Sequence, residues 1–366
     1  MKLVIVGPAH PLRGGIAHHV YSLTQELRSR GHQVLIISYR RLYPRIFFPG
    51  TTPFDSSHLK LDPGATAVLD SMNPLTWRRT FRVAQSSSPD AVLIQWWHPF
   101  FSLLVGSLGR MLQKAGLKSI LECHNVFPHE RAPWDPPLLR FAFSPFSSFI
   151  THSSADREDL LKLMPGRTVR VAPLPVLKEF SSQGDRPGGS RTVLFFGMVR
   201  KYKGLDILLR AMPKVLSKVD CELLIAGEFY EPVAKYQRLI RDLGVEHNVR
   251  IDNRYIPNEE VAELFRYARI LVMPYLSATQ SGIAQIAFAN GLPVIASRTG
   301  GLAEVVVEGV NGWLVPPGDV DALAAALVSY LSMEAAPGLS LDLQTSAGNN
   351  TPEDIEKVIQ DLVRLE

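Results

Sequence analysis

The chain has 366 residues, of which 46% are hydrophobic and 20% charged, and its formal net charge is +4. A disordered chain would be poorer in apolar residues, and a chain of this length usually forms two domains. The small positive charge does not demand a nucleic-acid partner, although it permits anionic substrates or a membrane face. Cys123 and Cys221 lie far apart in apolar segments, without metal-ligand spacing, and suit a reducing compartment.

The ends of the chain give no sign of a targeting or membrane-spanning segment. The apolar run at residues 3–6 is too short for the core of a signal peptide. No window reaches the ~18 uncharged apolar residues of a spanning helix. We therefore expect a soluble protein, or at most one that associates with a membrane surface.

The first half alternates buried strands with helix-periodic segments. Residues 3–6 form a strand, a glycine loop follows at 7–15, and a helix over 16–30 leads to a strand at 33–38. This βαβ unit predicts a parallel sheet. Residues 40–74 have no clear period, and we expect them to be irregular with edge strands. Further expected elements are strands at 91–95, 118–123, 149–152 and 169–172, and helices at 101–115 and from 153 onward.

The second half repeats this alternation after a Gly/Ser/Pro-rich linker at 181–190. We predict two doubly wound Rossmann-like α/β domains, residues 1–180 and 191–335, that face across a cleft. A flexible stretch over 333–351 precedes an amphipathic helix within 352–366, which needs a partner surface. The expected elements are strands at 192–196, 221–226, 249–251, 270–273 and 293–296, and helices at 205–218, 232–243, 258–268, 282–290 and 320–331.

The stretch from Arg191 to Ala211 has the layout of a phosphate site. A buried strand ends at Gly197, three cations follow (Arg200, Lys201, Lys203), and Gly204 precedes an amphipathic helix. Peptide N–H groups at a helix start and fixed cations favour a polyanion. The alternative is a solvated connecting loop that is basic by chance, and three cations between two glycines favour the anion site.

Motifs of the second half stand in a fixed order. They are Phe196-Gly197, Lys203-Gly204, the loop 274–282, the run 291–297 (GLPVIAS), the run 300–306 (GGLAEVV) and the run 311–319 (NGWLVPPGD). The first half adds Gly14-Gly15 after the first strand and His124-Asn125 after a later one. In these features the chain resembles the retaining, GT-B-fold glycosyltransferases of family 4, which use nucleotide-sugar donors. The resemblance implies that the last helix packs back on the N-terminal domain.

The resemblance also implies roles for individual residues. Gly14 and Gly15 would bring backbone amides to the donor diphosphate, although an ordinary tight turn has the same pattern. Lys203 matches the lysine on the donor phosphate, and Arg200 stands two places after the position of the usual arginine, which is Met198 here. The remaining implied contacts are His124 with the donor sugar, Gly197, Gly227 and Glu228 along the nucleotide, and Tyr255 and Ile256 against the base.

Two of those implied roles have structural alternatives. The alternative for His124 is a satisfied histidine at a strand end. The alternative for the loop that contains Tyr255 and Ile256 is packing only on its own domain. Both alternatives stay open at the level of sequence.

The loop after residue 274 departs from the family pattern. Family members carry two glutamates there, separated by seven residues, whereas this chain reads PYLSATQSGIAQIAFANG without a carboxylate. We expect Ser281 and Gly282 to present backbone amides to the diphosphate. Thr279 or Gln280 would meet the sugar hydroxyls and Gln285 the ribose, with neutral hydrogen bonds in place of charge-assisted ones. In the alternative, Gln285 satisfies a helix neighbour and no donor binds.

Two further patterns concern metal and acceptor. Asp319 and Asp321 form an Asp-x-Asp, but Pro-Pro-Gly before it and an alanine-rich helix after it predict an N-cap and a first-turn charge. No other acidic, His or Cys cluster in the sequence argues for a metal. Trp97 and His98 follow a strand end and are candidates for acceptor binding, with core packing as an equal alternative.

Together these features predict a retaining, metal-independent hexosyltransferase of polysaccharide biosynthesis. The nucleotide sugar is a substrate, so no cofactor is expected, and the acceptor would be a glycan, a lipid-linked sugar or a small molecule. We expect a cytoplasmic protein for which peripheral contact with the inner membrane face is allowed. The alternatives are a nucleotide-sugar epimerase of the same fold and a catalytically inactive sugar-nucleotide-binding protein.

Overall fold

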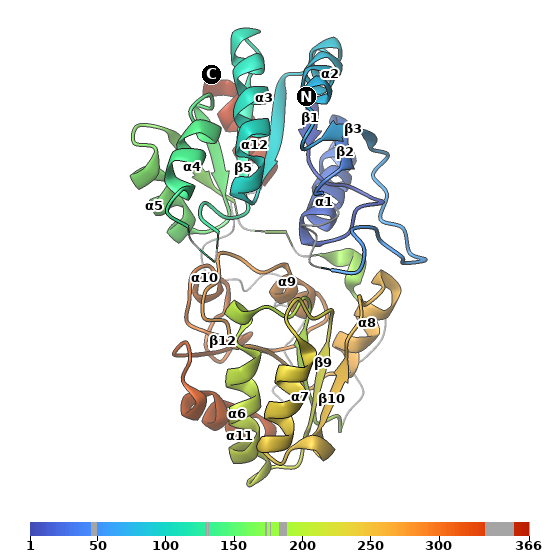
Figure 1. Ribbon diagram of the computed structural model, residues 1–366, viewed down its shortest axis with the longest axis vertical. Helices are drawn as coiled ribbons and strands as arrows, with labels where there is room; N and C mark the ends of the chain where they lie inside the picture. Colours follow the sequence, from blue (N-terminus) through green and yellow to red (C-terminus); the bar gives the residue numbers. More distant parts are fainter. Residues whose placement is uncertain are drawn as a thin grey trace. The chain divides into compact units, whose positions relative to one another are not determined.

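The computed structural model describes residues 1–44, 50–128, 130, 132–172, 174–175, 177–182, 189–333 and 355–365. The chain forms two compact units (Figure 1). The first comprises Met1–Ser56, Lys60–Pro175 and Pro352–Glu366, and the second Ser57–Leu59 and Val176–Thr351. The predicted linker falls mostly outside the described residues, and so does nearly all of the stretch predicted to be flexible.

The first unit is built on a parallel sheet with the strand order β3-β2-β1-β4-β5-β6-β7. The chain runs outward from β1 to β3 and then returns to β4 on the other side of β1. The topological switch point therefore lies between β1 and β4, where such sheets bind ligands. The strands are β1 (Lys2–Val6), β2 (Gln33–Arg41), β3 (Thr66–Asp70), β4 (Ala91–Trp96), β5 (Ser119–Cys123), β6 (Ser148–Thr151) and β7 (Thr168–Val171).

Helices cover both faces of this sheet, which explains why its strands are apolar on both sides. One face packs against α1 (Gly15–Ser29) and α12 (Ile355–Leu365). α12 buries its apolar stripe of Ile355, Val358, Ile359 and Leu362 there, so the last helix belongs to the first unit. The other face packs mainly against α3 (Ser102–Lys114), α4 (Asp135–Phe143) and α5 (Ser154–Leu163), with α2 (Pro74–Ser86) beside β3.

The second unit has a parallel sheet with the order β10-β9-β8-β11-β12-β13. Its switch point lies between β8 and β11. The strands are β8 (Thr192–Phe196), β9 (Glu222–Ala226), β10 (Val249–Asp252), β11 (Ile270–Met273), β12 (Val294–Ser297) and β13 (Gly312–Val315).

The helices of the second unit follow its strands in alternation. Those that pack on one face of the sheet are α6 (Leu205–Leu216), α7 (Val233–Asp242) and α11 (Val320–Leu331). The others are α8 (Asn258–Tyr267), α9 (Gly282–Ala289) and the short α10 (Leu302–Val305). Among the described residues, no helix combines the length and apolar character that crossing a bilayer requires.

The predicted architecture of two doubly wound sheets is correct, and some elements differ from expectation. Residues 40–74 contain an edge strand, β3, as expected, but β2 continues to Arg41. The sequence analysis also missed α2, α4 and β13. β13 is only four residues long, and its run of three apolar residues is too short to distinguish a strand from a loop.

Candidate functional site

The strongest candidate residue of the second unit is Lys203, at the carboxyl end of β8. Its chain passes through the short 3-10 helix η4 (Lys201–Lys203) before α6. The Nζ atom lies 3.1 Å from the point that a β-carbon on Gly197 would occupy, and 5.5 Å from the centre of the Tyr275 ring. The amine therefore lies over the glycine that ends the strand, as the phosphate-site interpretation requires.

The surroundings of Lys203 are unusual for a lysine. Only 5% of the residue is exposed. Burial, and then the neighbouring Arg200 cation, lower the pKa of Lys203 to about 7. Within the described parts of the chain no carboxylate pairs with it. Lys201, two residues earlier in the same loop, is exposed. A buried cation without a protein counter-ion favours an anionic ligand, because a ligand anion would offset the desolvation of the amine.

Glycine holds this loop against its neighbours. Gly204 is in the left-handed region with φ +66°, and a β-carbon there would lie 2.0 Å from the carbonyl oxygen of Pro274. Gly227, which follows β9, has φ +148° and would place a β-carbon 2.1 Å from the carbonyl oxygen of Gly197. The segments that follow β8, β9 and β11 are thus in direct backbone contact. At Gly204 and Gly227 a side chain would clash, so only glycine fits at these two positions.

Other predicted residues of the second unit lie on the same sheet edge. Glu228 is 8% exposed, and its carbonyl accepts a hydrogen bond from Val199 N at 2.9 Å. The Arg200 guanidinium lies 5.0 Å from the centre of the Tyr230 ring. This contact orients Arg200 without consuming its charge.

The loop between β11 and α9 carries the neutral replacements for the family's glutamates. Ser281 is the N-cap of α9, but its side chain makes no capping hydrogen bond. Gln285 is 6% exposed and makes no hydrogen bond among the described residues, which argues against the alternative that it satisfies a helix neighbour. Thr279 accepts a hydrogen bond from Gly301 N at 2.8 Å, and a β-carbon on Gly301 would meet the Gln280 side chain at 2.6 Å. The loop is therefore held by backbone contacts.

The predicted base-packing loop begins α8. Ile256 is buried, and the Tyr255 hydroxyl donates to Asn258 Oδ1 at 3.4 Å. Asn258 N in turn donates to Ser57 Oγ at 2.8 Å. Tyr255 is half-buried at the start of this hydrogen-bonded segment.

In the first unit, Gly14 is the N-cap of α1 and Gly15 is its first residue. A β-carbon on either glycine would meet nothing within 4 Å. The protein itself therefore leaves open space at Gly15, which agrees with a helix start that a ligand approaches.

His124 lies in a buried polar cluster that the sequence analysis missed. His19, Glu122, His124 and His152 place one possible ligand atom each within 4.8 Å of one another. In the sequence no cluster beyond Asp319 and Asp321 suggested a metal site, and the fold brings these four metal-ligand types together. His19 and His152 lie on or beside elements far from Glu122 in sequence, so no spacing signal could reveal them, although a glutamate and a glutamine inside apolar strands are themselves unusual.

Glu122 is the negatively charged group of this cluster. Burial alone would raise the pKa of Glu122, but the imidazoles of His19, His152 and His124 hold it well below its ordinary value. Burial, and then the neighbouring His19 and His152, keep the pKa of His124 well below its ordinary range. Burial likewise lowers the pKa of His152 to about 4. His124 is therefore a neutral imidazole beside a buried anion.

Trp97 and His98 differ in their surroundings. The Trp97 indole N–H donates to the Tyr43 hydroxyl at 2.9 Å, and its ring centre lies 4.3 Å from that of Phe101. These contacts favour the packing alternative for Trp97. His98 is exposed, and its Nδ1 accepts from Phe100 N at 3.1 Å at the start of η2 (Pro99–Phe101).

The structure confirms the N-cap interpretation of Asp319. Its carboxylate accepts from Ala322 N at 2.9 Å at the start of α11. Asp321 pairs with Lys214 on α6. Both carboxylates therefore have structural roles in the second unit.

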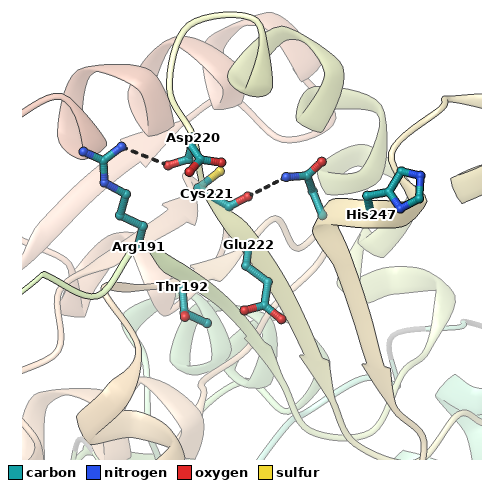
Figure 2. Close-up of a pocket in the computed structure, with 7 residues that line it drawn as sticks. Arg191, Thr192, Asp220, Cys221, Glu222 and His247 are labelled. Atoms are coloured by element: carbon teal, nitrogen blue, oxygen red, sulfur yellow. Dashed lines mark hydrogen bonds between the residues drawn. The ribbon is translucent and has the colours of Figure 1, made fainter.

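A pocket in the second unit lies away from this chemistry. Figure 2 shows it at the amino ends of β8 and β9, where Arg191 donates to the carbonyl of Asp220 at 3.4 Å. Asn248 donates to the carbonyl of Cys221 at 3.2 Å, and Thr192, Glu222 and His247 complete the lining. Lys203 and Gln285 follow the carboxyl ends of strands, where doubly wound sheets bind ligands, so this pocket is not the candidate site.

Two doubly wound sheets with a cationic strand end in the second unit define the GT-B class, and comparisons with known proteins agree. The model for "Glycosyltransferase Family 4" matches residues 13–177, and that for "Glycosyl transferases group 1" matches residues 190–333. Together they cover most of the chain. The chain belongs to the family-4 glycosyltransferases.

Characterised relatives and solved structures extend this result. The chain is 30% identical over 196 residues to D-inositol 3-phosphate glycosyltransferase of Corynebacterium diphtheriae, covering 50% of this chain and 45% of that protein. It is 35% identical over 208 residues to the GDP-mannose-dependent alpha-(1-6)-phosphatidylinositol monomannoside mannosyltransferase of Mycolicibacterium smegmatis, covering 53% and 51%. The matched part thus spans about half the length of these relatives. The structure of Anabaena HepE in complex with UDP-glucose superposes with a TM-score of 0.72 at 16% identity, covering 100% of this chain and 99% of that one, which shows the shared fold.

Proposed function

We propose that the protein transfers a sugar from a nucleotide-sugar donor to an acceptor with retention of configuration and without a metal ion. The buried Lys203 amine carries this proposal, because it has no counter-ion among the described residues and lies at the strand end where a donor diphosphate would bind. Its neighbour Arg200 supplies a second cation beside it.

In this proposal the two cations act on the leaving group. As the bond between the sugar and the diphosphate breaks, negative charge develops on the phosphate, and fixed cations stabilise that charge in the transition state. The free amides at the start of α9 would bind the same diphosphate, with Gln285 at the ribose. The two cations would neutralise the leaving diphosphate, as a divalent ion does in metal-dependent transferases. Asp319 and Asp321 are engaged in structural contacts, so we assign them no metal ion.

Retention is what the family resemblance implies. The loop at 274–291 contains no carboxylate that could serve as a nucleophile. We therefore propose a same-face attack in which the donor phosphate accepts the acceptor proton, as the family resemblance implies. His124, neutral and half-buried, would contact the transferred sugar.

The names of the relatives guide the choice of substrates. One is named as a GDP-mannose-dependent enzyme and another as acting on inositol phosphate, and a structural neighbour holds UDP-glucose. We propose a sugar-containing or lipid-linked acceptor, with a peripheral membrane contact at the cytoplasmic face where the acceptor is a lipid.

The test is a donor panel. UDP-glucose, GDP-mannose and related nucleotide sugars would be screened by thermal shift, and accepted donors incubated with sugar and lipid-linked acceptors in the presence of EDTA. Mass spectrometry should detect a glycosylated product, and NMR should show the anomeric configuration of the donor.

Three results would contradict parts of this proposal. Donor-dependent stabilisation without product would indicate an inactive binding protein, and conversion of the donor to its epimer would indicate an epimerase. Loss of turnover in EDTA would show that the reaction needs a metal ion. Lys203→Ala should lower turnover by ~10²–10³ without a large loss of stability, while the exposed Lys201→Ala serves as the matched control.

A further inference from the structure

Two polar side chains are buried at the ends of neighbouring strands in the first unit. Gln95 on β4 and Glu122 on β5 pair in register, and both are fully buried. Gln95 Nε2 lies 2.6 Å from Glu122 Oε2, and Gln95 Oε1 lies 2.6 Å from His124 Nε2. His19 Nε2 on α1 lies 2.7 Å from Glu122 Oε1. One chain of short hydrogen bonds therefore links α1 to the histidine that follows β5.

The direction of each hydrogen bond is determined by the carboxylate. An ionised carboxylate can only accept, so both Gln95 Nε2 and His19 Nε2 must donate to Glu122. The amide nitrogen of Gln95 is thereby fixed toward Glu122, and its oxygen faces His124. Because that oxygen can only accept, His124 Nε2 must carry a proton.

The backbone makes room for this arrangement. A β-carbon on Gly7, just after β1, would lie 2.5 Å from Cγ of Gln95. Glycine is needed there for space, since an alanine would push the glutamine side chain away from its partners. β1 is the neighbour of β4 in the sheet, so this contact is built into the strand order.

We infer that Gln95 and Glu122 are positioning residues that hold His124 with its proton on Nε2 and leave Nδ1 as an acceptor for a hydroxyl of the donor sugar. His124 Nδ1 makes no hydrogen bond within the described parts of the chain, and the residue is half-buried. The low pKa of His124 agrees with a single ring proton. The ligand in this inference rests on the proposed function, whereas the proton position rests on the hydrogen bonds around the ionised carboxylate of Glu122.

The same cluster has the composition of a metal site, but the hydrogen-bonded arrangement leaves Nε2 of His19 and of His124 unavailable to a metal ion. A ring nitrogen that carries a proton has no lone pair for a metal ion. In the hydrogen-bonded arrangement, both His19 and His124 carry that proton on Nε2. Zinc binding at these nitrogens would therefore overturn the inference.

Nitrogen NMR tests the proton position without any substrate. In protein with ¹⁵N-labelled histidine near neutral pH, His124 should show a protonated Nε2 and an unprotonated Nδ1, with the signals assigned by their loss in His124→Ala. In Gln95→Met, which keeps the chain length but removes the amide, the two shifts should move toward each other as the tautomers exchange. A proton on Nδ1, protons on both nitrogens, shifts unchanged in Gln95→Met, or ¹⁵N shifts that place one equivalent of Zn²⁺ on Nε2 of His19 and His124 would overturn it.

Kinetics test whether Gln95 acts through His124. Gln95→Met leaves a buried donor without its acceptor and should lower turnover of an accepted donor by about 5- to 150-fold. In the His124→Ala background the same change should cause no further loss, because a positioning residue has nothing left to position. Additive losses would show that Gln95 acts independently.

Thr24→Val is the control for these measurements. Thr24 is fully buried in α1 and donates to the Val20 carbonyl at 2.6 Å, so the variant loses a buried hydrogen bond outside the cluster. Its turnover should stay near that of the wild type. If the wild type transfers sugar from no donor, the proposed function fails, while the NMR spectra still decide the proton position.

Discussion

The buried amine of Lys203 predicts that donor binding weakens as pH rises. With a pKa of about 7, the amine is mostly cationic below neutral pH and mostly neutral above it. A bound diphosphate favours the cation and raises the pKa, so the complex takes up a proton whenever the free protein is neutral at this position. Affinity for a nucleotide sugar should therefore be highest at acid pH.

The size of the effect follows from linkage. If the pKa in the complex lies above 9, the dissociation constant scales with one plus the ratio of neutral to cationic amine. It should then rise by about 90-fold between about pH 6 and about pH 9. At about pH 8, binding should take up about 0.9 proton.

Calorimetry with UDP-glucose or GDP-mannose, whichever binds, measures both quantities. Titrations in buffers of different ionisation enthalpy give the proton uptake directly. Nucleotide sugars are better probes than nucleoside diphosphates, which have a terminal phosphate that itself titrates near neutral pH.

Two variants separate Lys203 from its surroundings. Lys203→Arg should flatten the pH dependence, because a guanidinium stays charged throughout this range, even where its shape lowers the absolute affinity. The exposed Lys201→Ala should keep the wild-type slope. A flat wild-type profile, or a slope that persists in Lys203→Arg, would refute the assignment of this cation to the diphosphate.

Four other changes have defined outcomes. Gly282→Ala should keep the melting temperature, because a β-carbon there meets only Leu177 at 3.7 Å, but raise the donor KM if a diphosphate approaches the amide; an unchanged KM would remove the helix start from the site. Gln285→Ala should raise the donor KM by about 2- to 13-fold, the worth of one hydrogen bond, and Gln285→Glu should restore most of it; equal values in all three proteins would contradict the ribose contact. Ile359→Ala should lower the free energy of unfolding, measured by chemical denaturation, by ~2–5 kcal/mol, because this side chain of α12 is 1% exposed in the core against the sheet; a loss below half of that range would mean that the helix is dispensable. His98→Ala should raise the acceptor KM without changing the donor KM, and an unaffected acceptor KM would end its assignment.

The sequence by itself determined the elements whose signals are local. The apolar runs of β1 and β8 predicted buried strands, and the apolar stripe of α12 predicted a helix that covers a sheet. The cap of α11 was also readable, because Asp319 and its partner amide at Ala322 lie within one helical turn. Patterns of this kind concern neighbours in the chain, so their physics does not depend on the rest of the fold.

Only the tertiary structure decided which polar residues meet. His19 and Glu122 are 103 positions apart, and they form a hydrogen bond because β1 lies between β2 and β4 and carries α1 against β5. The amine of Lys203 likewise lies against Gly197 and the ring of Tyr275, which follow two different strands. The sequence marks Lys203 as a cation in a loop, but its low pKa comes from desolvation, and desolvation depends on everything that packs around the amine.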